Sequence, residues 1–384
     1  MIAKKIYSKL KKLYRNRKQD LHEPYFSKQE NIEINKCLKS TFVSTKGKNT
    51  EKFEKKIQQI TKSKYSVAIV NATTGIFVCL KILGIKDGDE VLVPSLTFVG
   101  SVNPISYCNA TPHFIDLNDD LMDIDYDRLD YYLSTIVKFR NGYAYNKNTN
   151  RLIKAIIPVH LFGHPSNMTR CLSLAKKYNL KIVEDCAEAF GSKYQNKHVG
   201  NFGSMGVISF NGNKIITTGG GGIIITNSKK IYNKINHICS TSKIVKNFRM
   251  FHDEVGYNFK MPSLNASLGL AQLLKLKTSI KKKRLLYKKY DKVFKNDHDY
   301  KMMKEPIKTY SNYWLQTMIL NKKNKKYQKL IINYLNKKGI SVRPPWQPIH
   351  TLKPYRQCPK MILRNSLKAS TNLIHLPSGA NVGV

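Results

Sequence analysis

Short apolar runs alternate with segments of helical periodicity between residues 64 and 226. The runs are typical of buried strands, and strands are expected at residues 65–70, 90–93, 113–116, 153–159, 181–185, 207–210 and 223–226. Helices are expected between them, for example over residues 74–83 and 169–178. This alternation predicts an α/β fold whose mostly parallel sheet is covered on both faces, with functional residues at the strand ends.

Outside this region the pattern predicts a second, smaller unit. A long helix is expected over residues 264–290, a strand over 315–320 and a helix over 328–338, while the polar segment 141–150 is expected to be an exposed loop. We therefore expect a large domain over residues 23–270 and a small C-terminal α/β domain over residues 271–384.

Residues 1–22 are expected to form a basic N-terminal leader. Ile2, Ile6, Leu10 and Leu13 recur in it at helical spacing, which predicts an amphipathic helix. Such a helix packs on its own protein or stays mobile, and the alternative is a foothold on a membrane surface.

Composition limits the possible partners. Of the 384 residues 41% are hydrophobic, which is enough to bury a core in two units. Lys and Arg outnumber Asp and Glu by 66 to 25, but the excess is spread along the chain and no nucleic-acid-binding motif is visible. A solvated basic surface is therefore favoured over a dedicated polyanion site.

The seven cysteines lack the spacing of a disulfide framework or a metal site. With no apolar run of about 18 residues and no signal-peptide core, we expect a cytoplasmic protein without a transmembrane segment.

Lys214 lies in a turn rich in glycine, asparagine and threonine that follows the apolar run at 207–210. Beside the end of a sheet, desolvation would lower the pKa of its amine, as a nucleophilic lysine requires. The alternative is a lysine exposed in a solvated turn. The glycines at 219–222 are followed by an expected strand rather than a helix, so they indicate tight backbone turning and not a phosphate loop.

Three other groups stand at strand ends. Asp185 ends an apolar run, where it is either a functional acid or the N-cap of a helix. The segment Asn71-Ala-Thr-Thr-Gly75 precedes an expected helix, whose N-terminus favours an anion, although the same residues cap ordinary helices; Ser209 would add a hydroxyl. Phe98 could stack on a ring or belong to the core. A lysine, an acid, a phosphate cup and a stacking ring are the groups that pyridoxal phosphate (PLP) requires.

Taken in order, these segments resemble the DegT/DnrJ family of PLP-dependent sugar aminotransferases, over nearly the whole chain after the basic leader. The resemblance is carried by Asn71-Ala-Thr-Thr, Pro94-Ser-Leu-Thr-Phe98, Pro158-Val-His-Leu-Phe-Gly163, Glu184-Asp-Cys-Ala-Glu-Ala-Phe-Gly191, Ser209-Phe-Asn-Gly-Asn-Lys214 and Gly256-Tyr-Asn-Phe-Lys-Met261. It implies a PLP fold-type-I aminotransferase in which Lys214 is catalytic. The residues implied in cofactor binding are Ala72, Thr73, Phe98, Asp185, Glu188, Ser209 and Asn258. Asn258 would reach the phosphate in the neighbouring subunit, which implies a homodimer with shared active sites.

Two further segments, Asn312-Tyr-Trp314 and Arg343-Pro-Pro-Trp-Gln-Pro-Ile-His350, are similar to those of LegC-like aminotransferases. The similarity implies transfer of an amino group from glutamate to C4 of a UDP-4-keto-6-deoxy-N-acetylhexosamine, on the way to bacillosamine or legionaminic acid. The alternatives are an aminotransferase acting on another nucleotide-linked keto sugar, including dTDP- and GDP-sugars or a 3-keto sugar, and a non-catalytic binding protein with the same fold.

The residues expected to contact the substrate are Thr41, Phe42, Val43, Ser44, His160, Arg343, Trp346 and His350. A sugar diphosphate must meet positive or N–H-rich surface, which makes Arg343 and His350, with Trp346, candidates for the substrate mouth; the alternative is packing in the small domain. His160 is either a contact of the ring or sugar, or a satisfied core histidine.

Overall fold

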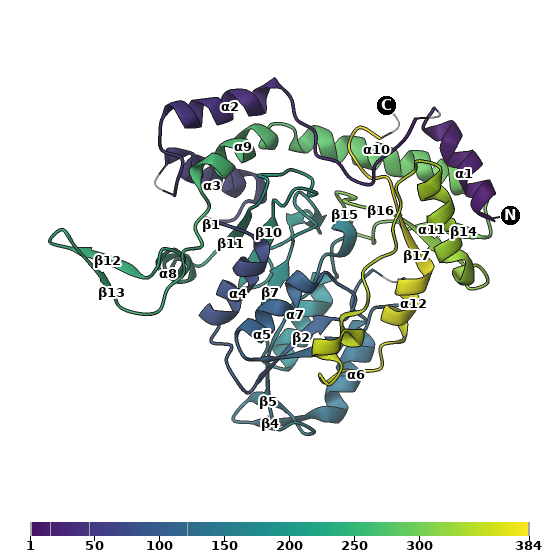
Figure 1. Ribbon diagram of the computed structural model, residues 1–384. Helices are drawn as coiled ribbons and strands as arrows, with labels where there is room; N and C mark the ends of the chain where they lie inside the picture. Colours follow the sequence, from purple (N-terminus) through teal and green to yellow (C-terminus); the bar gives the residue numbers. More distant parts are fainter. Residues whose placement is uncertain (1, 16, 46, 121, 383–384) are drawn as a thin grey trace.

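The computed structural model describes residues 2–15, 17–45, 47–120 and 122–382, and its centre is a nine-stranded sheet (Figure 1). The main path of the sheet runs β1-β11-β10-β7-β6-β2-β3. These strands are β1 (Tyr65–Ile69), β2 (Asp89–Pro94), β3 (Thr111–Ile115), β6 (Leu152–Ile156), β7 (Lys181–Asp185), β10 (Met205–Ser209) and β11 (Gly222–Thr226). The pairs from β10 to β3 are parallel, and β11 is antiparallel to both of its neighbours. All seven expected strands are present, and the sheet is mostly parallel as predicted.

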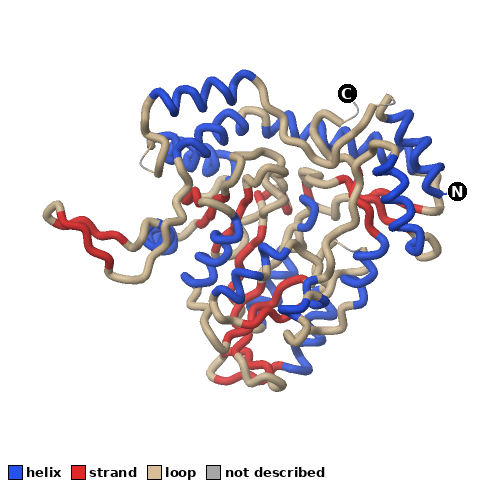
Figure 2. The backbone as a smooth tube through the Cα atoms, viewed as in Figure 1, coloured by secondary structure: helices blue, strands red, loops and turns tan. Residues whose placement is uncertain are grey.

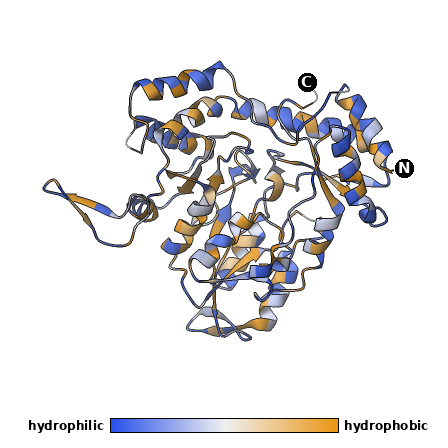
Figure 3. Ribbon diagram, in the orientation of Figure 1, coloured by the Kyte–Doolittle hydropathy of each residue, from blue (hydrophilic) through white to orange (hydrophobic). Residues whose placement is uncertain are grey.

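Both faces of the sheet are buried. Val67, Val207 and Ile224 enter one hydrophobic cluster together with α4, while their neighbours Ala68 and Ile208 enter another together with α3, α9 and α10. Because alternate residues of a strand point to opposite faces, burial on both faces explains the unbroken apolar runs in the sequence. The helices of this region are α2 (Lys28–Lys39), α3 (Lys48–Thr61), α4 (Ala72–Ile82), α5 (Asn103–Tyr107), α6 (Tyr126–Ile136), α7 (Met168–Lys177), α8 (Lys229–Cys239) and α9 (Ser263–Leu273). Figure 3 shows hydrophobic residues along the central strands and mixed colouring on the outer helices.

A smaller unit lies at one end of the sheet and has its own core (Figure 1). It contains α1 (Ile2–Leu13), α10 (Leu276–Phe294), α11 (Gln328–Lys337), α12 (Arg364–Asn372) and an antiparallel sheet of β14 (Tyr300–Met302), β16 (Gln316–Leu320) and β17 (Leu373–Leu376). Ile6, Leu10 and Tyr14 are fully or almost fully buried against α10 and the strands. The expected N-terminal helix therefore packs on its own protein. The division into domains at residue 270 stays a prediction.

Two expectations about local structure are wrong. The helix expected over 264–290 is interrupted at Leu274 and Lys275, where Lys275 pairs with Glu30 and α9 gives way to α10. The segment 141–150 is not only an exposed loop, because it contributes a strand to the hairpin of β4 (Val137–Arg140) and β5 (Tyr143–Asn146). The hairpin closes through Asn141 and Gly142, both at positive φ, as a two-residue hairpin turn requires.

The remaining elements are short. They are the strands β8 (Lys193–Tyr194), β9 (Lys197–His198) and β15 (Thr309–Tyr310), the hairpin of β12 (Lys243–Lys246) and β13 (Arg249–His252), and 3₁₀ turns at Val99–Ser101, Leu161–Gly163, Lys325–Tyr327, Ile349–Thr351 and Lys353–Tyr355. The β12–β13 hairpin stands out from the body of the molecule (Figure 2). None of the helices built from the described residues is long and apolar enough to cross a membrane.

Candidate active site

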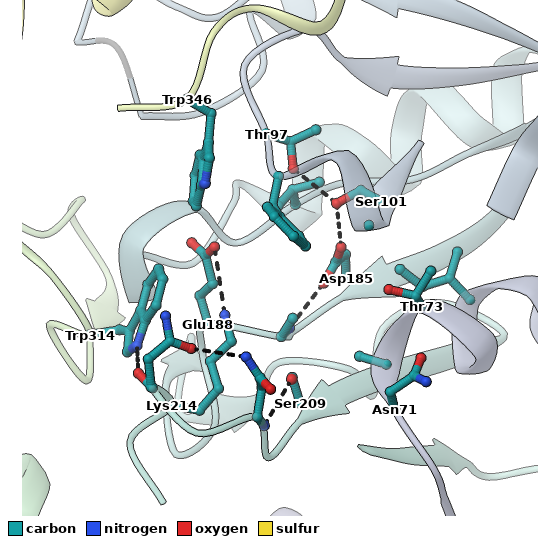
Figure 4. Close-up of a pocket in the computed structure, with 18 of the residues that line it drawn as sticks. Asn71, Thr73, Thr97, Ser101, Asp185, Glu188, Ser209, Lys214, Trp314 and Trp346 are labelled. Atoms are coloured by element: carbon teal, nitrogen blue, oxygen red, sulfur yellow. Dashed lines mark hydrogen bonds and ion pairs between the residues drawn. The ribbon is translucent and has the colours of Figure 1, made fainter. Parts of the chain in front are cut away.

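A cavity of about 330 Å³ opens at the carboxyl ends of the sheet strands (Figure 4). Segments that follow β1, β2, β7 and β10 form one side of it, and residues of the smaller unit form the other. It is lined by Asn71, Ala72, Thr73, Ile76, Thr97, Phe98, Gly100, Ser101, Val159, Asp185, Ala187, Glu188, Ser209, Asn211, Asn213, Lys214, Trp314, Arg343 and Trp346. In open α/β sheets this edge is where ligands bind.

Lys214 projects into the cavity from the loop between β10 and β11. Its side chain is 12% exposed, and its Nζ lies 3.9 Å from Oε1 of Glu188. The same Nζ lies 3.9 Å from the centre of the Trp314 ring. Burial lowers the pKa of the Lys214 amine, although the charges of Glu188 and Asp185 oppose the shift. Lys214 is therefore not a solvated turn lysine, and a lowered amine pKa is what a nucleophilic lysine requires.

Asp185 faces the same cavity from the end of β7. Its Oδ2 accepts a hydrogen bond of 2.6 Å from Ser101 Oγ, and its Oδ1 accepts one of 2.9 Å from the backbone N–H of Ala187. Ser101 Oγ in turn lies 2.9 Å from Thr97 Oγ1. The described residues directly after Asp185 form turns up to β8 and not a helix, so the N-cap interpretation is wrong and the carboxylate is fixed at the cavity wall.

Glu188 lies beside Lys214 and is 6% exposed. Its Oε2 accepts a hydrogen bond of 2.7 Å from the backbone N–H of Phe162. Burial raises the pKa of the Glu188 carboxyl to about 7, while the Lys214 cation opposes the rise. Lys214 and Glu188 thus form a buried pair in which each charge favours the charged form of the other.

The N-terminus of α4 opens onto the cavity opposite Lys214. Asn71 caps the helix by accepting a bond of 2.9 Å from the Thr74 N–H, which confirms the helix-cap interpretation, while the anion site at the same N-terminus stays a prediction. The N–H groups of Ala72 and Thr73 belong to the first turn, where a helix offers them no internal partner and its dipole favours an anion. The Ser209 hydroxyl lines the same wall.

Aromatic rings and one arginine close the mouth of the cavity. Phe98 is 52% exposed, so it does not belong to the core, and its ring centre lies 6.2 Å from that of Trp346. Trp314 and Trp346 stack with ring centres 6.4 Å apart. Arg343 Nε is buried without a hydrogen-bond partner among the described residues, and burial lowers the pKa of the guanidinium. This side chain is therefore available to an anionic ligand.

His160 and His350 do not reach the cavity, contrary to expectation. His160 is fully buried, with Nε2 3.3 Å from Glu184 Oε2 and Nδ1 accepting a bond of 3.0 Å from the Ser166 N–H. The other partners of Glu184 are the backbone N–H groups of residues 200, 202 and 203, so His160 is a satisfied core histidine. His350 Nδ1 lies 2.6 Å from Ser95 Oγ, and His350 is not one of the residues that line the cavity.

Five other expected contacts also lie outside the cavity of this chain. Thr41, Phe42, Val43 and Ser44 form an exposed loop whose carbonyls at 43 and 44 accept bonds from the backbone at the start of α9. Asn258 is exposed near the base of the β12–β13 hairpin, where it forms a β-bridge with Ser240. Their roles toward a ligand stay predictions, and the predicted role of Asn258 needs a neighbouring subunit.

Some lining residues escaped the sequence analysis as functional groups, above all Ser101, Trp314 and Asn213. Asn213 accepts a hydrogen bond of 2.8 Å from Trp314 Nε1 through its backbone carbonyl. The Ser101 contact is made 84 residues along the chain from Asp185, and no local pattern predicts a pairing over that separation.

The functional groups that line the cavity fit pyridoxal phosphate. A buried amine, a fixed carboxylate, the open N–H groups at the α4 N-terminus and an exposed aromatic face are the four groups that this cofactor requires. Gly100 preserves the space between the aromatic face of Phe98 and the N-terminus of α4. A Cβ at this position would come within 2.9 Å of both Phe98 and Thr73 Oγ1.

Known proteins resemble the chain over almost its whole length. GDP-perosamine synthase of Escherichia coli O157:H7 is 36% identical over 340 residues, which cover 88% of this chain and 87% of that protein. UDP-4-amino-4,6-dideoxy-N-acetyl-beta-L-altrosamine transaminase of Helicobacter pylori is 27% identical over 371 residues, with 94% and 93% covered. Among solved structures, the Helicobacter pylori aminotransferase PseC, involved in the biosynthesis of pseudoaminic acid, matches with a TM-score of 0.85 at 26% identity and covers 95% of both chains.

The resemblance extends to a whole protein family. The model of the DegT/DnrJ/EryC1/StrS aminotransferase family matches residues 24–383. The match and the structural neighbours confirm the expected PLP fold-type-I class, with PLP as the cofactor. The chain therefore belongs to the DegT/DnrJ/EryC1/StrS aminotransferase family.

Proposed function

We propose that this sugar aminotransferase moves an amino group from glutamate to C4 of a nucleotide-linked 4-keto-6-deoxy sugar. The observation that carries the proposal is the buried amine of Lys214, which faces a cavity bounded by Asp185 and by the N-terminus of α4. An amine with a lowered pKa, a carboxylate and an anion site are the arrangement that PLP-dependent amino transfer needs.

Each group has a distinct task. Bound PLP supplies an aldehyde for the amine and an electron-withdrawing ring. Lys214 Nζ holds the cofactor and, once freed, carries the proton between the Cα of the amino donor and C4′ of the cofactor. Asp185, fixed by Ser101, keeps the ring nitrogen protonated, while the N–H groups of Ala72 and Thr73 bind the phosphate.

Two nucleotide sugars are candidates for the acceptor. The Escherichia coli relative, at 36% identity, is named for a GDP-linked sugar, which supports a GDP-4-keto sugar. The LegC-like segments around Trp314 and Arg343 support a UDP-4-keto-6-deoxy-N-acetylhexosamine, and the Helicobacter pylori relative is also named for a UDP-linked sugar with a 4-amino group. In either case Arg343 and Trp346 are the proposed contacts for the nucleotide diphosphate and its base.

The experiment that tests this proposal is a substrate panel. The purified chain, PLP and glutamate are incubated with GDP-, UDP- and dTDP-4-keto-6-deoxy sugars and with a 3-keto sugar, and 2-oxoglutarate and the amino sugar are measured together. We expect amination at C4 of the GDP- or the UDP-linked sugar, with the kcat/KM for the preferred nucleotide at least about tenfold above that for dTDP. Binding of PLP without amination of any of these sugars would instead favour the non-catalytic alternative.

We also propose that the enzyme works as a homodimer. The β12–β13 hairpin presents apolar side chains to solvent, with Phe248 fully exposed, Met250 68% exposed and Val245 64% exposed. A contiguous exposed apolar arm of this kind indicates an interface. Asn258 lies near its base, which supports the proposed reach of that residue toward the phosphate of the other subunit.

Replacing Val245, Phe248 and Met250 together by serine is expected to convert the dimer into monomers and to weaken PLP binding. Size-exclusion chromatography with light scattering measures the mass, and absorbance titration measures the affinity. The matched control replaces Lys243, Lys246 and Arg249 of the same hairpin by serine and is expected to stay dimeric. A wild-type chain that is monomeric at micromolar concentration would contradict the proposal.

A further inference from the structure

Lys283 is a buried lysine that the proposed chemistry does not use. It lies on α10, is 1% exposed, and forms no ion pair with a carboxylate among the described residues. Burial lowers the pKa of its amine to about 7. An ammonium without a carboxylate partner is costly to bury, so a lysine at such a position needs a structural or functional reason.

The Nζ of Lys283 holds together three segments that are far apart in the sequence. It lies 2.8 Å from His22 Nε2, donates a bond of 3.0 Å to the Trp314 carbonyl and donates another to the Ser378 carbonyl. Three acceptors match the three N–H groups of an ammonium. The N-terminal segment, the segment before β16 and the segment after β17 are thus fixed to α10 at one point.

Trp314 connects this point to the active site. Its backbone carbonyl is held by Lys283, while its ring covers Lys214 with the ring centre 3.9 Å from Nζ. Trp314 Nε1 also donates a bond of 2.8 Å to the carbonyl of Asn213, the residue before Lys214. In addition, Lys214 and Lys283 both line a second cavity, of about 270 Å³. The carbonyl and the ring of one residue therefore face the two lysines.

We propose that Lys283 is a positioning residue for Lys214 and acts through Trp314. By fixing the Trp314 backbone it keeps the ring over the Lys214 amine and excludes water from that side. The inference rests on the proposed function of Lys214 as the cofactor anchor. The charged groups that act on the Lys214 amine are Glu188, Asp185 and Arg343, and Lys283 is not among them. The titratable ring of His22 interacts with both lysines.

The first test measures how well the Trp314 ring is shielded from solvent, and it requires neither cofactor nor turnover. The chain contains two tryptophans, so a Trp346→Phe background leaves Trp314 as the only indole. In this background we expect Lys283→Met to raise the acrylamide quenching constant of Trp314 at least about threefold, because the ring loses its close packing. Lys282→Met removes the same charge from the next position of α10, where the side chain is exposed and bonds Asn381, and is expected to leave quenching unchanged.

The second test reads the amine of Lys214. The rate at which PLP attaches to the cofactor-free chain depends on the neutral fraction of that amine, so its pH midpoint reports the Lys214 pKa. We expect the midpoint to rise by about one unit in Lys283→Met, because water that replaces the ring relieves the burial that lowers this pKa. Trp314→Phe leaves Lys283 in place and is expected to raise the midpoint similarly, with no further rise in the double variant.

The outcomes distinguish failure of the positioning role of Lys283 from failure of the proposed function of Lys214. A folded Lys283→Met chain with wild-type quenching and a wild-type midpoint overturns it, and so does a raised midpoint in Lys283→Met with none in Trp314→Phe. If Lys283→Met does not fold, an unchanged midpoint in Trp314→Phe is sufficient to overturn the proposal. Should mass spectrometry of the reduced wild type find PLP on another lysine, the proposed function fails, while the quenching comparison still tests whether Lys283 holds Trp314.

Discussion

Replacement of Lys214 by arginine is expected to reduce turnover by about 10⁴-fold or more, since one side chain both anchors the cofactor and moves the proton. The guanidinium keeps the positive charge beside Glu188, but it cannot form the carbon–nitrogen bond to the cofactor or act as a base near neutral pH. Some PLP should remain bound noncovalently through Asp185 and the α4 N-terminus. Formation of 2-oxoglutarate measures turnover, and borohydride reduction followed by peptide mass spectrometry locates the covalent bond.

The matched control for this variant is Lys337→Arg, at the C-terminus of α11 and outside the lining of the cavity. It is expected to have wild-type activity and a wild-type reduction pattern. Full activity of Lys214→Arg, or a borohydride label on any other lysine, would show that the assignment of the anchor is wrong.

Asp185→Asn is expected to lower kcat by roughly 200- to 5,000-fold while the cofactor stays attached. Removing one partner of a buried charge pair costs about 3–5 kcal/mol. If this whole cost is added to the activation free energy, kcat falls by that range. The amide retains the shape of the side chain and its contact with Ser101, so the fold should be unaffected. Single-turnover measurements with glutamate separate this loss of chemistry from a loss of substrate binding.

Two further variants sharpen the interpretation. Ser101→Ala removes only the hydrogen bond to Asp185 and is expected to cost kcat far less, on the order of tenfold. Asp130→Asn breaks an exposed ion pair with Lys177 and is expected to leave kcat unchanged. A wild-type kcat in Asp185→Asn would exclude the carboxylate from the role at the ring nitrogen.

The part of the site that lies at strand ends could be predicted from the sequence. Lys214, Asp185 and the segment at 71–75 each follow a continuous apolar run, and the ends of parallel strands meet at one edge of a sheet. Local pattern alone left each of them with an ordinary structural alternative. Only the shared cavity, together with the burial of Lys214, decides between the two interpretations.

Contacts between distant segments could not be predicted in the same way. Trp314 reaches Lys214 from 100 residues away, and no periodicity encodes that packing. The break between α9 and α10 carries neither glycine nor proline, so the apolar pattern continues through it. His160 was a candidate for the substrate because the family motif contains it, yet its ring is used by Glu184 and Ser166 inside the core.

The position of α1 has a consequence for how the polypeptide is made. This helix is made before its partners, because Ile6 and Leu10 belong to one buried cluster with residues of α10 and with Leu376, which all follow it in the sequence. Synthesis at about 5–20 residues per second leaves its apolar stripe without a partner for tens of seconds. The sheet can form during that interval, whereas the core of the smaller unit is completed only after β17 has been synthesised. The lysine-rich outer face of α1 would keep this helix soluble until its core partners have been made.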